Sequence, residues 1–165
     1  MKKFILTATL LTVALPATLP AALAQNSQSQ KVDGFSAIAA LAKLKGLVLS
    51  QADIARLFAN LKPGSVEAKN LSALFGISLD AFNQLVAAKG APIPLALATR
   101  AVLEAATGKT LTTEAVAQVL KNNPTAITSY ADLLTLATNP TLASNLANQA
   151  AVIAATPVTP RGGGN

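Results

Sequence analysis

Apolar residues recur along most of this chain at the spacing of one face of an α-helix. After Ser50, for example, the apolar positions lie three, one and three residues apart, at Ile54, Leu57, Phe58 and Leu61. This is the repeat of an amphipathic helix. No segment alternates apolar and polar residues with β-branched side chains, so the pattern predicts no strands. The expected fold class is all-α, a compact bundle of about eight short helices.

Capping and turn residues divide this pattern into segments. Ser50 with Asp53 resembles a capping box, and a Gly just after the last apolar position predicts a left-handed C-terminal cap. Twice, Asn followed by Pro predicts a cap and a first helical residue. Five expected helices run from Asp33 to near Gly46, Ser50 to Pro63-Gly64, Ser65 to Gly76, Ser78 to Gly90 and Leu95 to Gly108. Three more are expected to begin at Thr112, at Asn123-Pro124 and at Asn139-Pro140.

Isolated helices this short are marginal in water, so each must bury its apolar stripe against its neighbours. The positions expected to face inward include Ile38, Leu41, Ile54, Leu57, Phe58, Leu61, Ala68, Leu71, Leu74, Phe75, Phe82, Leu85, Val86, Val116, Val119, Leu120, Ile127, Tyr130, Ala131, Leu134, Leu142, Leu146, Ala150 and Ile153.

The first 24 residues have the layout of a bacterial secretory signal peptide. Lys2 and Lys3 precede an apolar run from Phe4 to Leu15, and Ala22-Leu23-Ala24 forms a small-x-small cleavage box. An uncleaved membrane anchor is the alternative, but Pro16 and Pro20 favour cleavage after Ala24. We therefore expect export to the periplasm or the medium, with no transmembrane segment in the mature chain.

The rest of the chain is predicted to form a single helical domain over residues 33–156. A polar lead-in, residues 25–32, precedes it, and a flexible Pro- and Gly-containing tail, residues 157–165, follows it. Pro92 and Pro94 lie where the charge and the Thr content change, so a division into two half-domains there is the alternative. Each half would be marginal alone, which favours a single core.

Composition excludes several kinds of chemistry. The chain has 165 residues, 52% of them apolar and 12% charged, and it contains no Cys, His or Trp. It can therefore form no disulfide, zinc finger, Cys nucleophile or Ser-His-Asp triad. Cleavage would remove two of the 13 basic residues and lower the net charge from +6 to +4. Residues 31–89 carry seven basic and four acidic side chains, whereas residues 91–160 carry three of each.

One segment resembles a helix-turn-helix. The residues with its spacing are Leu71, Ser72, Phe75, Gly76, Ile77, Ser78, Phe82 and Leu85. The resemblance implies a tight turn at Gly76 and a second helix that presents Leu79, Asp80, Asn83 and Gln84 to DNA. Asp80 would repel phosphates and the signal peptide directs the chain away from the chromosome, so binding of chromosomal DNA is not expected.

No catalytic, cofactor-binding or metal-binding residue is predicted. The carboxylates Asp53, Glu67, Asp80, Glu104, Glu114 and Asp132 mostly occupy first helical turns or lie beside basic residues, where they stabilise helix ends. A basic interaction face could be formed by Lys43, Lys45, Arg56, Lys62 and Lys69. It would suit an anionic envelope polymer or lipid, although a merely solvated face is the commoner outcome.

Together these features predict a non-catalytic exported protein of the cell envelope or matrix. It would act by binding a protein partner or by self-assembly. A module that encloses an apolar ligand or lipid between its alanine-rich helices is the first alternative. An enzyme that uses paired carboxylates and a helix-turn-helix DNA binder are the others.

Overall fold

A computed structural model describes residues 31–157, and in this range the chain forms eight helices and one two-stranded sheet. The all-α prediction is confirmed. The predictions for the signal peptide, for residues 25–30 of the lead-in and for the tail after residue 157 lie outside the described residues. The elements are β1 (Lys31–Asp33), α2 (Gly34–Leu44), α3 (Gln51–Ala59), α4 (Val66–Phe75), α5 (Leu79–Ala88), β2 (Pro92–Pro94), α6 (Leu95–Thr107), α7 (Thr113–Asn122), α8 (Tyr130–Thr138) and α9 (Pro140–Ala155).

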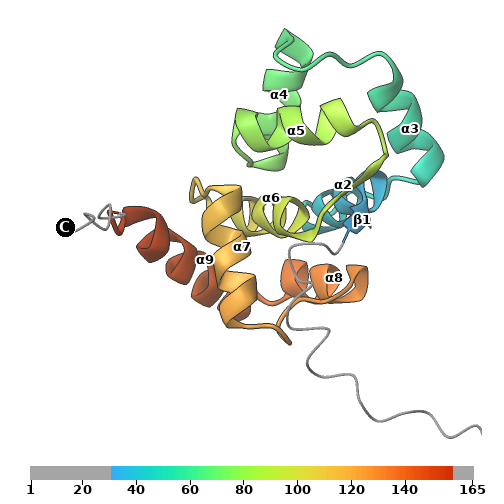
Figure 1. Cartoon of the computed structure of the whole chain (residues 1–165). Helices are drawn as coiled ribbons and strands as arrows, with labels where there is room; N and C mark the ends of the chain where they lie inside the picture. The colour runs from blue at the N-terminus through green and yellow to red at the C-terminus, as the bar shows by residue number, and fades with distance from the viewer. Residues whose placement is uncertain (1–30, 158–165) are drawn as a thin grey trace, which may run out of the picture.

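Helix α6 is the centre of the structure. It packs against α2, α5, α7, α8 and α9, and every residue from Leu95 to Ala105 is buried. A helix that is surrounded on all sides must be apolar almost all round, and α6 is so except at Thr99, Arg100 and Glu104. Figure 1 shows α3, α4 and α5 on one side of α2 and α6, and α7, α8 and α9 on the other. The buried apolar residues form a single cluster that extends from Val32 to Ala150.

The capping residues that the sequence identifies do begin and end most of the helices. The Ser50 hydroxyl accepts a hydrogen bond from the Asp53 backbone N–H at 3.1 Å, and the Asp53 carboxylate accepts one from the Ser50 N–H at 3.1 Å, which completes the capping box. Gly76 ends α4 with φ of 71°, and Gly108 ends α6 with φ of 69°. Only glycine adopts such left-handed dihedrals without strain.

The prediction of no strands is wrong for two short segments. Strands β1 and β2 pair antiparallel, with Val32 opposite Ile93. Each has three residues, too few to show a period of two, and about 60 residues separate them along the chain. Lys31 and Val32, which the sequence assigned to the lead-in, therefore belong to the packed structure, and the Val32 side chain is buried.

The helix predicted directly after Asn123-Pro124 is also wrong. Instead of capping a following helix, the Asn123 amide donates hydrogen bonds to the Val119 carbonyl and to the Gln149 side chain. Helix α8 begins only at Tyr130, where the Ser129 hydroxyl accepts from the Asp132 N–H at 3.3 Å. Tyr130 and Ala131 are consequently exposed at the start of the helix and do not face inward.

Between residues 31 and 157, no single helix has both the length and the apolar character needed to cross a membrane. Helices α4 and α5 meet those criteria only when taken together, and a bend of 113° separates them.

Candidate functional site

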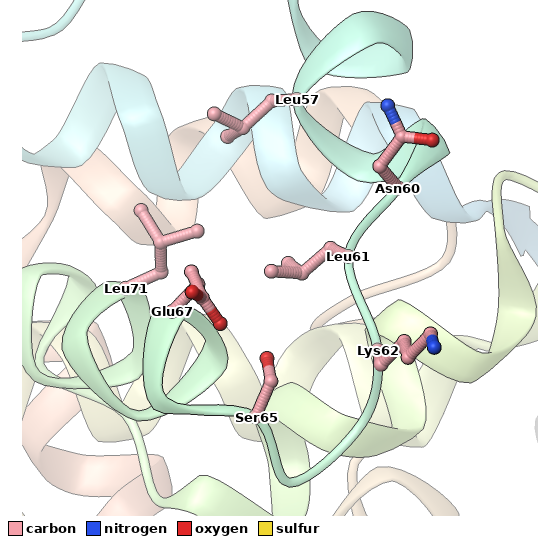
Figure 2. Close-up of a pocket in the computed structure, with 7 residues that line it drawn as sticks. All are labelled: Leu57, Asn60, Leu61, Lys62, Ser65, Glu67 and Leu71. Atoms are coloured by element: carbon pink, nitrogen blue, oxygen red, sulfur yellow. The ribbon is translucent and has the colours of Figure 1, made fainter.

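Several hollows of similar volume are found in the described part of the chain, and one of them lies between α3 and α4. Its volume is about 360 Å³. We call it the α3–α4 groove, and it is lined by Leu57, Asn60, Leu61, Lys62, Ser65, Glu67 and Leu71. Figure 2 shows Leu57 and Leu71 reaching in from the two helices, with Leu61 facing them from the segment that joins these helices. The walls are therefore mainly leucine side chains, and the polar residues surround them.

The groove exists because two predicted core positions are not buried. Leu57 is 42% exposed and Leu71 is half-buried, while Leu74, also predicted to face inward, is 59% exposed but does not line the groove. Helix α3 packs on α2 and α4 packs on α5, while Phe58 of α3 and Phe75 of α4 both contact the Phe82 ring of α5. Leu57 and Leu71 lie outside this aromatic contact and stay at least partly open to solvent.

The polar residues of the groove differ in what they already bind. The Ser65 hydroxyl caps α4 by accepting a hydrogen bond from the Ala68 N–H at 3.1 Å. Glu67 lies in the first turn of α4, and Lys62 lies in the segment that joins α3 to α4. The ion pairs found over residues 31–157 all belong to Arg100, so neither Glu67 nor Lys62 is paired there.

The five residues of the predicted basic face are all exposed, but they lie on four separate segments. Lys62 lines the α3–α4 groove. Lys45 instead donates to the Ala105 carbonyl at 3.2 Å. There it neutralises the negative end of α6, a common role for lysine at a helix C-terminus. Lys43, Arg56 and Lys69 line none of the hollows described, and a shared basic face stays a prediction.

A second polar feature lies where α5, α6 and α7 meet, with two buried members, Arg100 and Glu104, and the 69% exposed Asp80 at its edge. We call it the Arg100 cluster, and it consists of Arg100, Glu104, Ser78 and Asp80. Arg100 is 5% exposed and Glu104 only 1%. Arg100 donates from Nε to Glu104 at 3.1 Å, from Nη1 to Asp80 at 2.8 Å and from Nη2 to the Ser78 hydroxyl at 3.0 Å. Removing such charges from water is unfavourable unless they are fully bonded, and here they are.

Glu104 is saturated with donors. Its Oε2 accepts from the backbone N–H and the hydroxyl of Ser78, both at 2.8 Å. Its Oε1 accepts from Arg100 and from the Leu111 N–H at 2.9 Å. The carboxylate therefore ties the start of α5 and the loop before α7 to the middle of α6. Because protein donors occupy both oxygens, it is a structural link and offers no free lone pair for acid-base chemistry.

Hydrogen bonding controls the pKa values in this cluster and at the caps. The hydrogen bond from Arg100 holds the pKa of Asp80 below its usual value. Burial acts to lower the pKa of Arg100, but its bonds to Asp80 and Glu104 outweigh burial and raise it. At the helix caps, the Ser50 hydroxyl lowers the pKa of Asp53, and the Thr128 N–H lowers that of Asp132. These carboxylates thus serve helix ends, and no group of three metal-ligating side chains occurs between residues 31 and 157.

Helices α4 and α5 have the geometry of the helix-turn-helix that the sequence resembles. The 113° bend falls within the range of about 90–120° that this motif shows. The polar side chains of α5 are nevertheless already engaged. Asn83 accepts from the Gly64 N–H at 2.7 Å, and Asp80 accepts from Gln84 at 3.1 Å and from Arg100. The N-terminus of α5, which would read bases, instead faces the Arg100 cluster.

No match to this chain is found among the known protein families, the characterised proteins or the solved structures compared with it.

Sequence reasoning missed the burial of Arg100 and Glu104. The signal was present, because a basic and an acidic residue four apart stand alone in a helix that is otherwise apolar on every side. It also missed the groove, since Leu57 and Leu71 have the spacing of core residues. That spacing shows which residues share a face but not whether another helix covers it.

Proposed function

We propose that this chain is exported from the bacterial cytoplasm and acts outside it as a non-catalytic helical protein. On this proposal it binds another protein, or a second copy of itself, at the α3–α4 groove. Export is supported by the arrangement of residues 1–24, with two lysines, an apolar run and a small-x-small box. The interaction is supported by the groove, whose walls keep Leu57 open to solvent.

The leucines of the groove are the observation that carries the proposal. Exposed aliphatic side chains that stand singly are normal, whereas several that gather around a hollow with polar edges mark an interaction site. Here the exposed Leu57 and the half-buried Leu71 line one groove, and the buried Leu61 forms its floor. The Arg100 cluster is a weaker candidate, because its buried side chains already bond one another.

Photocrosslinking in living cells tests the interaction. A photoreactive amino acid replaces Asn60, which lines the groove but is not part of its apolar wall. The expected result is one discrete crosslinked species in the envelope or medium fraction, lost when Leu57→Ser is added. Val152→Ser is the matched control variant, and position 152 is the control site for the photoreactive amino acid, because Val152 is 66% exposed on α9 and lines a separate hollow.

The same samples test export, because mass spectrometry of the purified chain reports its N-terminus. A mature chain that begins at Gln25 is expected in the periplasm or the medium. Full-length protein confined to the cytoplasm would refute export. Crosslinks that persist in Leu57→Ser, or equal crosslinks from positions 60 and 152, would refute the groove as the contact.

A further inference from the structure

The two sides of the α3–α4 groove carry opposite charges. Glu67 stands beside Leu71 on α4, and Lys62 stands beyond Leu61 on the other side (Figure 2). Both side chains are exposed, and within residues 31–157 neither forms an ion pair or a side-chain hydrogen bond. Glu67 is therefore available to an occupant of the groove directly. The Lys62 side chain points away from the leucines in Figure 2, but it is free to turn toward an occupant because it is exposed and has no ion-pair partner among the described residues.

The walls determine the backbone conformation that an occupant needs. An extended peptide gains its affinity by bonding to an exposed sheet edge. The α3–α4 groove offers no such edge, because its lining residues come from α3, α4 and the segment that joins them, and none belongs to a strand. An occupant must therefore satisfy its own backbone, which an α-helix does. The leucines at positions 57, 61 and 71 then match the apolar stripe of that helix.

We propose that the occupant is an amphipathic α-helix whose apolar stripe is bordered by a basic flank on one side and an acidic flank on the other. The basic flank faces Glu67 and the acidic flank faces Lys62. This inference rests on the proposed function, since it names the chemistry of the partner at the same groove. Because the two edges differ in sign, only one chain direction of such a helix places both flanks correctly.

Three synthetic helical peptides test the charge pattern on the full chain, purified from the cell fraction where it accumulates. All three share one leucine stripe, bordered by lysine on both flanks, by glutamate on both, or by lysine on one and glutamate on the other. A peptide can reverse its direction in the groove, so a mixed peptide always finds one matched orientation. We expect the mixed peptide to bind about 1.5- to 5-fold more tightly than either other peptide, the range for exposed charge pairs.

Charge reversal on the protein sharpens this test. Glu67→Lys makes both edges basic and is expected to shift the preference to the all-glutamate peptide, whereas Lys62→Glu shifts it to the all-lysine peptide. Glu114→Lys is the control for the first variant, because Glu114 also lies in the first turn of its helix. Lys69→Glu is the control for the second, because Lys69 is exposed on α4 but does not line the groove. In 1 M salt the preferences should shrink, because the screening length falls to about 3 Å.

The result that overturns the inference is equal binding of the three peptides, binding of none, or preferences that move as far in the controls as in the groove variants. The proposed function is judged separately, since the crosslink from position 60 depends on Leu57 and on no charge. Anionic lipid vesicles that bind better than every peptide, and lose binding with Lys62→Glu and Lys69→Glu alike, would indicate a membrane surface and refute the helix.

Discussion

Glu104 offers the most direct test of how this fold is held together. Its two carboxylate oxygens accept four hydrogen bonds, two from Ser78, one from Arg100 and one from Leu111. The substitution Glu104→Gln keeps the size and shape of the side chain but replaces one oxygen with an NH₂ group. Turned toward Arg100 and Leu111, that NH₂ faces two N–H donors. Turned toward Ser78, it faces a backbone N–H and a hydroxyl oxygen whose two lone pairs already accept from Ala81 and Arg100, so two bonds are lost in either orientation.

The expected loss follows from the number of bonds. A hydrogen bond to a charged group contributes about 1.5–3 kcal/mol, so losing two costs about 3–6 kcal/mol. A second estimate comes from the ion pair. Removing one partner of a buried pair costs about 3–5 kcal/mol, and in Glu104→Gln the charged Arg100 would lose one of its two carboxylate partners. We therefore expect the free energy of unfolding to fall by about 3–5 kcal/mol, a large part of the roughly 5–15 kcal/mol that is typical of a whole domain.

Urea unfolding followed by circular dichroism measures this loss, because the chain is mostly helical and has no tryptophan to report by fluorescence. Glu114→Gln is the control, since Glu114 is exposed at the start of α7, and its effect should stay within about 0.5 kcal/mol. A loss below about 1 kcal/mol in Glu104→Gln, with an unchanged dependence on urea, would refute the reasoning that the four bonds stabilise the fold.

Three other changes probe the caps, the ion pairs and one close approach. The pKa of Asp80 is lowered in the folded state by Arg100, so its contribution is present above the ordinary value near 3.8 and is lost as pH falls through the lower folded value. In Asp80→Asn, the stability should therefore fall less than in the parent chain when the pH is lowered below about 4. Thermal unfolding at a series of pH values measures this difference. Ser50→Ala removes the capping box of α3 and should cost about 0.5–2 kcal/mol in urea unfolding. Gly90→Ala should cost more than the roughly 1–2 kcal/mol of a left-handed residue, because its φ is 83° and the new Cβ would overlap the Phe35 ring.

Control substitutions at other positions show whether each loss of stability is specific to the residue that was changed. Gly64 also has a left-handed φ, of 77°, but a Cβ there meets no atom within 4 Å, so Gly64→Ala should cost less than Gly90→Ala. Equal losses would show that the Phe35 ring moves aside freely. Ser144→Ala, at an exposed position inside α9, should leave stability within about 0.5 kcal/mol. An acid profile that is the same in Asp80→Asn and in the parent chain would contradict the part assigned to Arg100.

Local signals predicted the helices well wherever capping residues and apolar spacing agreed. Ser50, Ser65 and Ser78 each begin a helix through a side-chain hydrogen bond, and such bonds involve only residues two or three apart. The failure at Asn123-Pro124 came from two competing local signals. Ser129 with Asp132 was the stronger, because Thr128 adds two further bonds to the same carboxylate.

Non-local features could not be predicted in the same way. The pairing of β1 with β2 joins segments that are far apart, and nothing within three residues shows a strand. The apolar surroundings of Arg100 and Glu104 in α6 signal that both are buried. They do not show which residues these two side chains bond, because Ser78 and Asp80 lie 20 to 26 residues away, at the start of α5. Leu57 is a residue of the opposite kind, because the sequence predicted that it would be buried and it is exposed. The sequence shows the apolar face of α3 but not whether another helix covers it. The candidate site was therefore less predictable than the fold, because it depends on which faces remain uncovered.

The composition of β2 also limits what the small sheet can do. Pro92 and Pro94 flank Ile93, so two of the three residues of this strand have no backbone N–H. A strand edge with almost no donors is a poor template for another chain, and proline is a common means of blocking such an edge. The sheet therefore cannot readily grow at the β2 edge. A protein that accumulates at high local concentration would thus lack one of the usual starting points for fibril formation.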